Sequence, residues 1–539
     1  MPEGALRLAG GLGRQVWLTG AMVLAGLGHA MAIAWPLPDW GPFAAGEPLP
    51  WLQWLSLVAL VLAVRGAVTW RGALASGWLF ATAWLTGTFW WLYVSMHVYG
   101  GLPAPLAALA VLALAVSLSS YYGVAMALFW RWRQSSACLA VPAFAALWVL
   151  AEWARGTWFT GFPWGAAGYA HVDALAVLAP YVGVYGMGAV AAAAAAGAVW
   201  WLAGRRKPLG AAGWALWLLV LVWPGAGAWL ADASPSWTRS AGTLPVTLLQ
   251  GNIPQNEKFQ TSSGVPLALQ WYEAQILAAT QAPSARLVVA PETAIPVLPQ
   301  ELDAAYWDGL QSAVRQGASA VMLGIPLGDW EQGYANSVVG WTPQGLNEGQ
   351  AYRYDKHHLV PFGEFIPPLF RWFTAMMQIP LGDFNRGALG QPTLAWAGQR
   401  VAPNVCYEDL FGEELAVSFL DPSQAPTVLV NVSNIAWFGD TVAIDQHRQI
   451  ARLRARELER PMLRATNTGA TAIIDHQGRV LAEYPRLTRG VLHGEVQGRE
   501  GVTPYARWAG TWGLWPLVLG ALALLGAVWP WRRGAGAPN

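Results

Sequence analysis

The sequence predicts a polytopic α-helical membrane region joined to an α/β domain, and three observations support this fold class. Hydrophobic residues make up 55% of the 539 residues and charged residues only 12%, which is about half the charged share usual in soluble proteins. Eight apolar stretches have lengths suited to crossing a bilayer, for which roughly 20 residues are needed. A long segment between the seventh and the eighth stretch alternates strand-like and helix-like runs, as α/β domains do.

The composition also limits the partners that the chain can have. Its net charge is only +1, which disfavours nucleic acid as a partner. The low charge and the aromatic share of 12% exclude intrinsic disorder. Because a water-facing surface cannot cover so apolar a chain, the lipid bilayer is the expected partner. Two cysteines, Cys138 and Cys406, allow at most one disulfide, and their expected positions on opposite sides of the membrane exclude it.

The apolar stretches are predicted to be transmembrane helices. They lie near residues 17–36, 51–65, 74–96, 104–130, 137–154, 176–203, 211–231 and 509–531. The first is long, lacks a clear cleavage site and is followed by further spans, so it is interpreted as a retained helix and not as a signal peptide. Near the end of the fifth stretch, Glu152 and Arg155 are expected to form an interfacial pair, unless Glu152 reaches headgroup water.

Loop charge predicts the orientation, because Lys and Arg near helix ends favour the cytoplasm. Basic residues gather in alternate connections and are Arg7, Arg14, Arg65, Arg71, Arg131, Arg133, Arg205, Arg206, Lys207, Arg532 and Arg533. The intervening short loops, 37–50, 97–103 and 155–175, together contribute only Arg155. Both termini are therefore expected in the cytoplasm. The predicted domains are residues 1–231 with seven spans, an outward domain at residues 232–508, and residues 509–539 with the last span and tail.

The outward domain contains five strand-like runs, which are residues 244–249, 286–290, 320–324, 427–432 and 471–474. Three segments in this domain end an apolar run with a reactive side chain. They are 288–292, 352–356 and 401–408, and they carry Glu292, Lys356 and Cys406. Ligand sites of α/β sheets assemble at the carboxyl ends of strands, so these three side chains are candidates for one site. Singly, each also fits a structural role: a buried small cysteine, a solvated lysine and a surface glutamate.

The segments around these residues resemble a known superfamily. Glu292 within APET, Lys356 within DKHHLVPFGE and Cys406 within NVCYED match, in order, the Glu-Lys-Cys triad of the carbon-nitrogen hydrolase, or nitrilase, superfamily. The resemblance implies an αββα sandwich for the outward domain. With its predicted spans the whole chain is similar to the apolipoprotein N-acyltransferase family, as are residues 249–255, 431–440 and 460–469. The chain departs from that family at Phe259, where Trp is frequent, and at Ile435, where Asp is frequent.

The resemblance implies a reaction and roles for its residues. A fatty acyl chain passes from a phospholipid to the N-terminal amine of the S-diacylglyceryl-cysteine of an apolipoprotein, by a ping-pong mechanism through a thioester on Cys406. Glu292 is the expected general base, and Lys356 is expected to stabilise the oxyanion. Glu364, Tyr407 and Glu408 are expected to support the triad, and structural salt bridging is the alternative for the two glutamates. The resemblance and the predicted topology place the chain in the inner membrane of a Gram-negative bacterium, with the catalytic domain in the periplasm.

No cofactor and no metal ion are expected. The three histidines of the outward domain closest to the candidate residues have no spacing typical of metal ligands, and they are His357, His358 and His447.

Aromatic residues outside the triad are candidates for contact with lipid. The segment 362–381 is unusually apolar for a water-facing loop, so it is interpreted as a membrane-dipping lid that admits lipid and excludes water. Packing of this segment against the domain core is the alternative. The candidates are Phe259, Phe365, Trp372, Phe373, Trp437 and Phe438.

Two other functions remain open at the level of the sequence. A membrane-anchored amidase of the nitrilase type would use water, and not an amine, to resolve its acyl-enzyme. A membrane scaffold or transporter could carry an inactive domain of this type. The apolar segment 362–381 favours a lipid substrate, and the complete set of Glu292, Lys356 and Cys406 opposes the scaffold.

Overall fold

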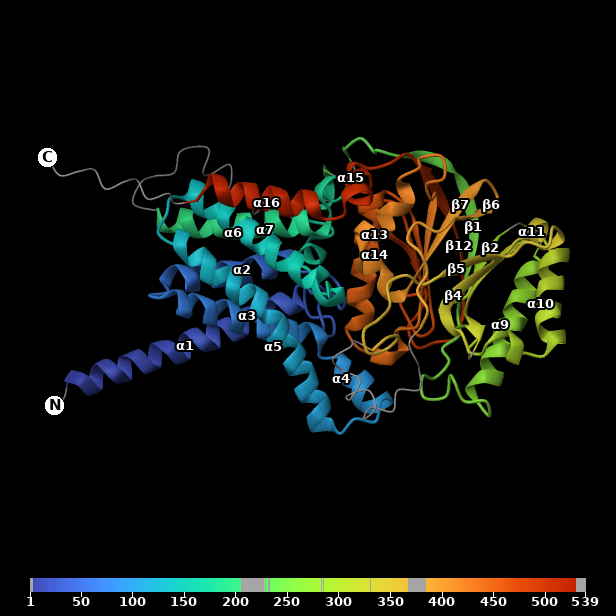
Figure 1. The fold of residues 1–539 in the computed structure, drawn as a ribbon, viewed down its shortest axis with the longest axis horizontal. Helices are drawn as coiled ribbons and strands as arrows, with labels where there is room; N and C mark the ends of the chain where they lie inside the picture. The colour runs from blue at the N-terminus through green and yellow to red at the C-terminus, as the bar shows by residue number, and fades with distance from the viewer. Residues whose placement is uncertain are drawn as a thin grey trace. The chain divides into compact units, whose positions relative to one another are not determined.

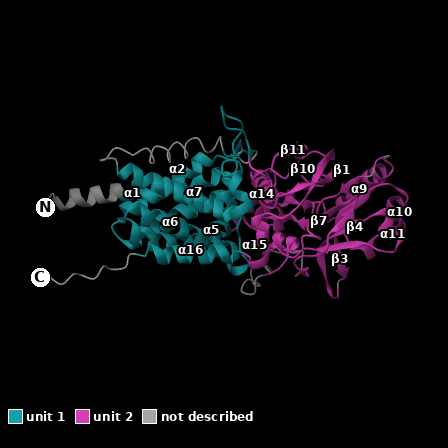
Figure 2. Ribbon diagram, turned by 90° about the horizontal axis from the view of Figure 1, so that it is seen from above, with its two compact units in different colours: residues 1–90, 108–233, 514–539 teal, residues 91–107, 234–513 magenta. Residues whose placement is uncertain are grey.

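The computed structural model divides the chain into two compact units (Figure 2). It describes residues 3–204, 227, 229–230, 233–282, 284, 286–329, 331–366 and 384–529. One unit, called the helical unit here, comprises residues 1–90, 108–233 and 514–539. The other, the sheet unit, comprises residues 91–107 and 234–513. The short segment 91–107 thus belongs with the sheets although long helices precede and follow it in the sequence.

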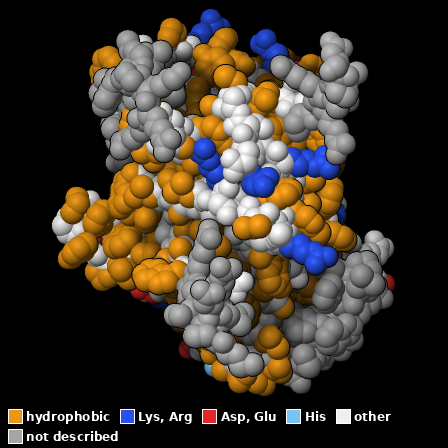
Figure 3. All heavy atoms as spheres, turned by 90° about the vertical axis from the view of Figure 1, so that its left-hand side faces the viewer, with side chains coloured by type: hydrophobic (Ala, Val, Ile, Leu, Met, Phe, Trp, Pro, Cys, Tyr) orange, Lys and Arg blue, Asp and Glu red, His pale blue; other side chains and the backbone are white. Residues whose placement is uncertain are grey.

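Long apolar helices build the helical unit (Figure 1). They are α1 (Glu3–Met31), α2 (Pro50–Gly66), α3 (Trp70–Phe89), α5 (Ala104–Phe129), α6 (Ala137–Thr157), α7 (Ala179–Ala203) and α16 (Trp515–Ala527). Many large apolar side chains on them point outward, among them Leu55, Leu62, Leu109, Leu112, Val124, Leu519 and Leu522. Figure 3 shows hydrophobic side chains over much of one face, with Lys and Arg side chains between them. Such a surface suits lipid and not water.

The predicted spans are matched in part. Within the described residues, three helices are long and apolar enough to cross a membrane, Ala104–Trp132, Ala137–Thr160 and Ala176–Ala203, which match the fourth, fifth and sixth predicted spans. The described second span is a shorter apolar helix, Pro50–Gly66. The predicted seventh span, 211–231, lies largely outside the described residues. The helices therefore indicate a membrane protein, but eight spans are not confirmed.

The predicted eighth span, 509–531, is broken into two helices. α15 (Pro504–Trp512) ends before Gly513, which has a φ of 56°, and α16 starts at Trp515. Side chains of α15 such as Tyr505 and Ala509 pack into a core of the sheet unit. The two helices are bent by 91° at the break, and they are long and apolar enough for a span only when taken together. A positive φ interrupts a helix, which is why one apolar stretch gives two elements.

The segment 155–175, predicted to be a short external loop, is largely buried in the helical unit, although Trp158 and Phe159 are 49% and 91% exposed. It forms short 3-10 turns at Trp158–Thr160 and Ala167–His171, and the second turn is wholly buried. The chain reverses at Gly161, whose φ is 77° and where a Cβ would collide with the carbonyl of Gly156. Irregular backbone in a membrane region is tolerated only where protein groups satisfy its polar atoms.

Glu152 and Arg155, which were expected to form an interfacial pair, supply some of those groups. Both side chains are 0% exposed. Arg155 Nη1 donates to the carbonyls of Phe162 and Trp164, the latter at 2.8 Å, and Glu152 Oε1 accepts from the backbone N–H of Ala167 at 2.7 Å. Both side chains therefore form hydrogen bonds with the main chain of residues 162–167.

Two six-stranded sheets form the sheet unit. The strand order of the first is β12-β1-β2-β3-β4-β5 and that of the second is β11-β10-β9-β8-β7-β6. The first contains β1 (Arg239–Gln250), β2 (Leu287–Val289), β3 (Ala320–Asp329), β4 (Gly333–Trp341), β5 (Tyr352–Asp355) and β12 (Gly490–Glu500). The second contains β6 (Leu394–Trp396), β7 (Gln399–Val405), β8 (Val428–Ser433), β9 (Met462–Thr466), β10 (Ala472–Ile474) and β11 (Val480–Glu483). All five predicted strand-like runs are confirmed as strands.

The sheets are the two inner layers of an αββα sandwich, as predicted. Leu287 and Val289 of β2 face the core between the sheets, whereas Val288 faces a second core on the outer side. Burial on both faces explains why the strand runs are almost continuously apolar. The outer layers are α9 (Gly264–Thr280), α10 (Ala304–Gln316) and α11 (Pro343–Asn347) on the first sheet and α13 (Gly412–Ala416), α14 (Ala443–Leu458) and α15 on the second (Figure 1).

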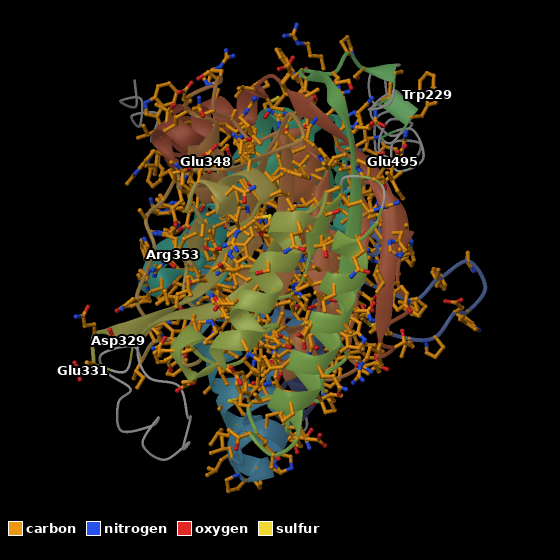
Figure 4. All side chains as sticks on the ribbon, turned by 90° about the vertical axis from the view of Figure 1, so that its right-hand side faces the viewer. Trp229, Asp329, Glu331, Glu348, Arg353 and Glu495 are labelled. Carbon is orange, nitrogen blue, oxygen red and sulfur yellow. The ribbon has the colours of Figure 1, made fainter. Side chains whose placement is uncertain are left out.

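Charged side chains lie over the side of the sheet unit seen in Figure 4. The labelled charged residues are Asp329, Glu331, Glu348, Arg353 and Glu495. This surface is typical of a domain that faces water, in contrast to the apolar faces of the helical unit.

We expect the substitution Arg155→Met to destabilise the helical unit, because the buried carbonyls of Phe162 and Trp164 would lose their donor. Each buried group left unsatisfied costs about 1–3 kcal/mol, so the apparent melting temperature in detergent should fall by roughly 4 °C or more. Differential scanning fluorimetry measures this. The control is Arg133→Met, whose side chain donates to Trp130 of its own turn from a half-buried position. Equal melting temperatures for the two variants would contradict the buried role of Arg155.

Candidate active site

Polar side chains converge where strands of both sheets end. Glu292 follows β2, Lys356 directly follows β5, and Cys406 directly follows β7. Because β7 and β8 are parallel neighbours, Ser433 at the end of β8 reaches the cysteine, and its Oγ donates to Cys406 Sγ at 3.3 Å. The three candidates predicted from the sequence therefore lie in one site.

Two hydrogen bonds fix the Glu292 carboxylate. Its Oε1 accepts from Asn336 Nδ2 at 2.7 Å, and its Oε2 accepts from the backbone N–H of Asn434 at 2.7 Å. The residue is 8% exposed, so few water molecules compete for these positions. Donors on both oxygens hold the plane of the carboxylate in one orientation. A proton acceptor that must meet one particular atom benefits from such rigidity.

The Lys356 ammonium lies between two carboxylates. Its Nζ is 2.9 Å from Glu364 Oε1 and 3.7 Å from Glu292 Oε1, and the side chain is 1% exposed. Asn336 Nδ2 also donates to Glu364 Oε1, at 2.8 Å, and so links the two acids. Burial alone would lower the pKa of Lys356, but the carboxylates of Glu364 and Glu292 raise it above its ordinary value. The lysine is thus a permanent positive charge.

The Cys406 thiol is neutral at rest. Burial, and next the charge of Glu292, raise its pKa to about 12, although Lys356 and the Ser433 hydroxyl act in the opposite direction. The residue starts a 3-10 turn with a φ of 52°, a conformation that is uncommon outside glycine and frequent at functional sites. Since the thiolate is the reactive form of cysteine, this thiol needs a base in order to react.

Glu408 holds the turn that presents the cysteine. Its Oε2 accepts from the backbone N–H of Val405 at 2.6 Å and from the Tyr354 hydroxyl at 2.8 Å. Its Oε1 accepts from the backbone N–H groups of His357 and His358, at 2.7 and 3.2 Å. One carboxylate thus joins the chain before the cysteine to the chain after the lysine. The expected supporting position of Glu408 agrees with this geometry.

The other expected supporting residues take different places. Glu364 contacts Lys356 and, through its Oε2, accepts from the backbone N–H of Val360 at 2.8 Å. Tyr407 is 4% exposed, and its ring packs against Phe411 and His358. Glu364 therefore belongs to the network of charges, whereas the Tyr407 ring belongs to an aromatic cluster.

Two lipid-contact candidates rest on the segment 91–107. Phe438 packs on Trp91 with ring centroids 4.2 Å apart, and Trp437 meets Tyr99 at 5.9 Å. Both belong to a short 3-10 turn, Ile435–Phe438, that starts directly after Asn434. An aromatic cluster thus adjoins the loop whose backbone holds Glu292.

The remaining lipid-contact candidates are only partly described. Phe259 is 41% exposed. Phe365 is half-buried, with the Arg386 guanidinium 5.1 Å from its ring centroid. Trp372 and Phe373, in the middle of the predicted lid, lie outside the described residues.

Sequence reasoning missed the amides and hydroxyls of the site. Asn336 interrupts the apolar run of β4, and its only signal is a polar residue in a strand buried on both faces. Ser433 and Asn434 lie within the segment 431–440 that resembles the family, but nothing in their spacing shows that they contact Cys406 and Glu292. Among the described residues, no group of three or more His, Cys, Asp and Glu side chains could hold a metal ion.

Two family models and many curated proteins are similar to this chain. The apolipoprotein N-acyltransferase N-terminal domain matches residues 27–197, and the carbon-nitrogen hydrolase model matches residues 246–505. An apolipoprotein N-acyltransferase from Verminephrobacter eiseniae is 55% identical over 520 residues, which cover 92% of this chain and 94% of that protein. Another from Ralstonia nicotianae is 45% identical over 505 residues, which cover 90% of each chain.

Solved structures with some similarity cover half of the chain. An amidase from Nesterenkonia sp. aligns with 51% of this chain and 96% of its own, at 15% identity and a TM-score of 0.34. A carbon-nitrogen hydrolase from Helicobacter pylori aligns with 52% of this chain and 95% of its own, at 14% identity and a TM-score of 0.33.

We expect charge substitutions at the site to move the ionisation of Cys406 in opposite directions. Glu292→Gln removes a negative charge that raises the pKa of the Cys406 thiol. The titration midpoint of this thiol should therefore fall below about 12. Lys356→Met removes a positive charge that lowers that pKa, so the midpoint should rise. The measurement is the ultraviolet absorbance of the thiolate against pH in a Cys138→Ala background. Midpoints that do not move, or that move together, would refute the coupling.

We expect Glu408→Gln to impair the site without removing a triad residue. The amide keeps one acceptor oxygen, so it cannot serve all four donors that Glu408 now binds. Each lost hydrogen bond to a charged group costs about 1.5–3 kcal/mol, and the reactivity of Cys406 toward an acyl donor should fall by about 10-fold or more. The matched control is Glu348→Gln, on the exposed surface labelled in Figure 4. Full reactivity of the Glu408 variant would argue against its supporting role.

Proposed function

The chain belongs to the apolipoprotein N-acyltransferase family, and on that premise we propose that Glu292, Lys356 and Cys406 perform its acyl transfer. A fatty acyl chain passes from a phospholipid to the N-terminal amine of the S-diacylglyceryl-cysteine of an apolipoprotein, the last step of lipoprotein maturation. The observation that carries the assignment is the network in which the Lys356 ammonium lies 3.7 Å from the Glu292 carboxylate beside the Cys406 turn.

In the first half-reaction the phospholipid ester acylates the cysteine. Glu292 takes the proton of the Cys406 thiol, which the high pKa of that thiol makes necessary. The sulfur attacks the ester carbonyl, and the Lys356 ammonium stabilises the oxyanion, a role in which loss of one donor costs about 10²–10³-fold. When the carbon–oxygen bond breaks, Glu292 returns the proton to the leaving lysophospholipid oxygen. A thioester on Cys406 remains.

In the second half-reaction the acceptor amine resolves the thioester. The neutral amine attacks the thioester carbonyl, and Glu292 takes a proton from the nitrogen. The Lys356 ammonium again faces the oxyanion. When the carbon–sulfur bond breaks, the thiolate leaves and regains its proton from Glu292. The products are the amide of the lipoprotein and the free thiol, and Glu292 is again a carboxylate.

The supporting groups keep these atoms in place. Glu364 holds the Lys356 ammonium at 2.9 Å, and Glu408 ties the cysteine turn to the residues after the lysine. Tyr407, the residue after the nucleophile, packs its ring against Phe411. These residues act through the triad and do not touch the reacting atoms.

We also propose the topology indicated by the basic loops. Eight helices span the bacterial inner membrane, both termini lie in the cytoplasm, and residues 232–508 form the catalytic domain in the periplasm. Residues 1–231 and 509–539 supply seven helices and one helix. Both substrates carry acyl chains, and each buried methylene contributes about 0.8 kcal/mol to membrane binding. Anchoring the catalytic domain at the bilayer therefore concentrates it with both substrates.

The aromatic candidates are proposed to contact these lipids. Trp437 and Phe438 follow the loop that holds Glu292 and are only half-buried, and Phe259 is 41% exposed. The predicted lid with Phe365, Trp372 and Phe373 would complete an apolar path toward Cys406. Exclusion of water from that path protects the thioester from hydrolysis.

We expect a hydroxylamine-sensitive fatty-acyl adduct on Cys406 when the purified protein is incubated with phospholipid micelles without acceptor. Intact-mass measurement before and after neutral hydroxylamine detects it. Cys406→Ala should show no adduct, and Glu292→Gln should form it about 10²–10⁴-fold more slowly because the general base is missing. Cys138→Ala is the matched cysteine control and should behave as the unmodified protein does.

Adding the acceptor separates the two candidate reactions. If the acyl group passes to the amine of a diacylglyceryl-cysteine peptide, the N-acyltransferase assignment stands. If no adduct forms on Cys406 and short amides are hydrolysed, the membrane-anchored amidase is the better account.

A further inference from the structure

A second buried lysine adjoins the proposed triad and has no role in the reaction described above. Lys258 is 2% exposed, and its Nζ donates to the main-chain carbonyl of Glu292 at 3.1 Å. It follows the loop that leaves β1, immediately before the exposed Phe259. Lysine is seldom fully buried without a partner of opposite charge, and this one has a neutral oxygen as its hydrogen-bond acceptor.

Amide groups hold the loop of Lys258 against the site. Gln255 Oε1 accepts from Asn434 Nδ2 at 2.8 Å, and the carbonyl of Ile253 accepts from Asn467 Nδ2 at 2.9 Å. The backbone N–H of Asn434 is also the donor to Glu292 Oε2. Asn434 therefore contacts both the general base and the loop that carries Lys258. These hydrogen bonds fix the position of that loop.

The two buried lysines of the site have different surroundings. Lys356 contacts the carboxylate of Glu364 and lies near that of Glu292, which keep it charged. The titratable groups that act on Lys258 are Glu292, at the end of β2, and Cys406, at the end of β7. Burial lowers the pKa of Lys258 to about 7, although these two groups act to raise it. Lys258 thus gains or loses its proton near neutral pH.

We propose that the charge on Lys258 controls the acylation of Cys406, with the ammonium as the active form and the neutral amine as the inactive one. This inference rests on the proposed function. Acylation moves negative charge from Glu292 to the sulfur and then to the ester oxyanion, and a nearby positive charge in a buried site stabilises each of these states. The hydrogen bond to the Glu292 carbonyl also holds the main chain that carries the base.

The pH dependence follows from the sign of this effect. Below a pH of about 7 Lys258 is charged and acylation is supported, and above it the support is lost. The second half-reaction has the opposite demand, because only the neutral form of the acceptor amine attacks and an α-amino group has an ordinary pKa of about 7.7–8.0. Near neutral pH the rate of acylation therefore falls as the pH rises, whereas the rate of the second half-reaction increases. Lys258 sets the pH at which the acylation rate falls.

The test is the rate of thioester formation on Cys406 against pH, with phospholipid micelles and no acceptor, for the full chain and for Lys258 variants. Lys258→Arg keeps a charge at all these pH values, so the alkaline decline should disappear. Lys258→Met has neither charge nor donor and should acylate about 10-fold or more slowly at low pH, without that decline. Lys258→Gln keeps an N–H donor for the Glu292 carbonyl but no charge, and should follow Lys258→Met.

The matched control is a positive charge of the same unit that lies on the surface. Arg353→Gln removes a positive charge from the exposed edge strand β5 of the same unit (Figure 4) and should leave the profile unchanged. If the unmodified chain forms the thioester and every Lys258 variant keeps its alkaline decline, or if Lys258→Gln matches the unmodified chain, this inference is overturned while the proposed function stands. If the unmodified chain forms no thioester on Cys406 at any pH, the proposed function itself fails.

Discussion

The cost of burying charge is the constraint on which the site depends. Glu292, Glu364 and Lys356 are all less than one-tenth exposed, and an isolated charge in such a place would neutralise itself or unfold the structure around it. The amide of Asn336 bridges the two acids, and the ammonium lies between them. Each buried polar group of this network thus has a partner. The carboxylates raise the pKa of Lys356, and burial raises the pKa of the Cys406 thiol, so an ammonium lies in the same site as a neutral thiol that needs a base.

The same constraint shapes the helical unit by a different route. There the buried charges of Glu152 and Arg155 are directed at the backbone of residues 158–171, whose turns leave carbonyl and N–H groups outside any helix. Gln53 adds a hydrogen bond to the carbonyl of Ala167 and another to His171. A polar segment can thus be enclosed by apolar helices. In the sheet unit, by contrast, the buried Lys356 ammonium pairs with carboxylates of the proposed active site.

The segment 91–107 packs next to the loop that positions Glu292, although long helices precede and follow this segment in the sequence. It belongs to the sheet unit, where Trp91 donates to Gln446 of α14 at 3.0 Å and packs on Phe438. The turn that contains Phe438 begins after Asn434, whose N–H holds the proposed base. Aromatic residues suited to a membrane interface are therefore only a few residues away from the groups that position Glu292.

From the sequence alone came an α/β domain, five of its strands and three helices that are long and apolar enough to cross a membrane, because these depend on local periodicity. The αββα arrangement and the residues of the proposed triad came from motifs along the chain. The sequence could not determine the partners of those residues. Asn336, Asn434 and Lys258 meet Glu292 from distant parts of the chain, and residues 167–171 are buried although the composition of the loop 155–175 resembles that of an external loop. Only tertiary packing decides such contacts, since hydrogen bonds and burial depend on which segments meet and not on the spacing of residues within one segment.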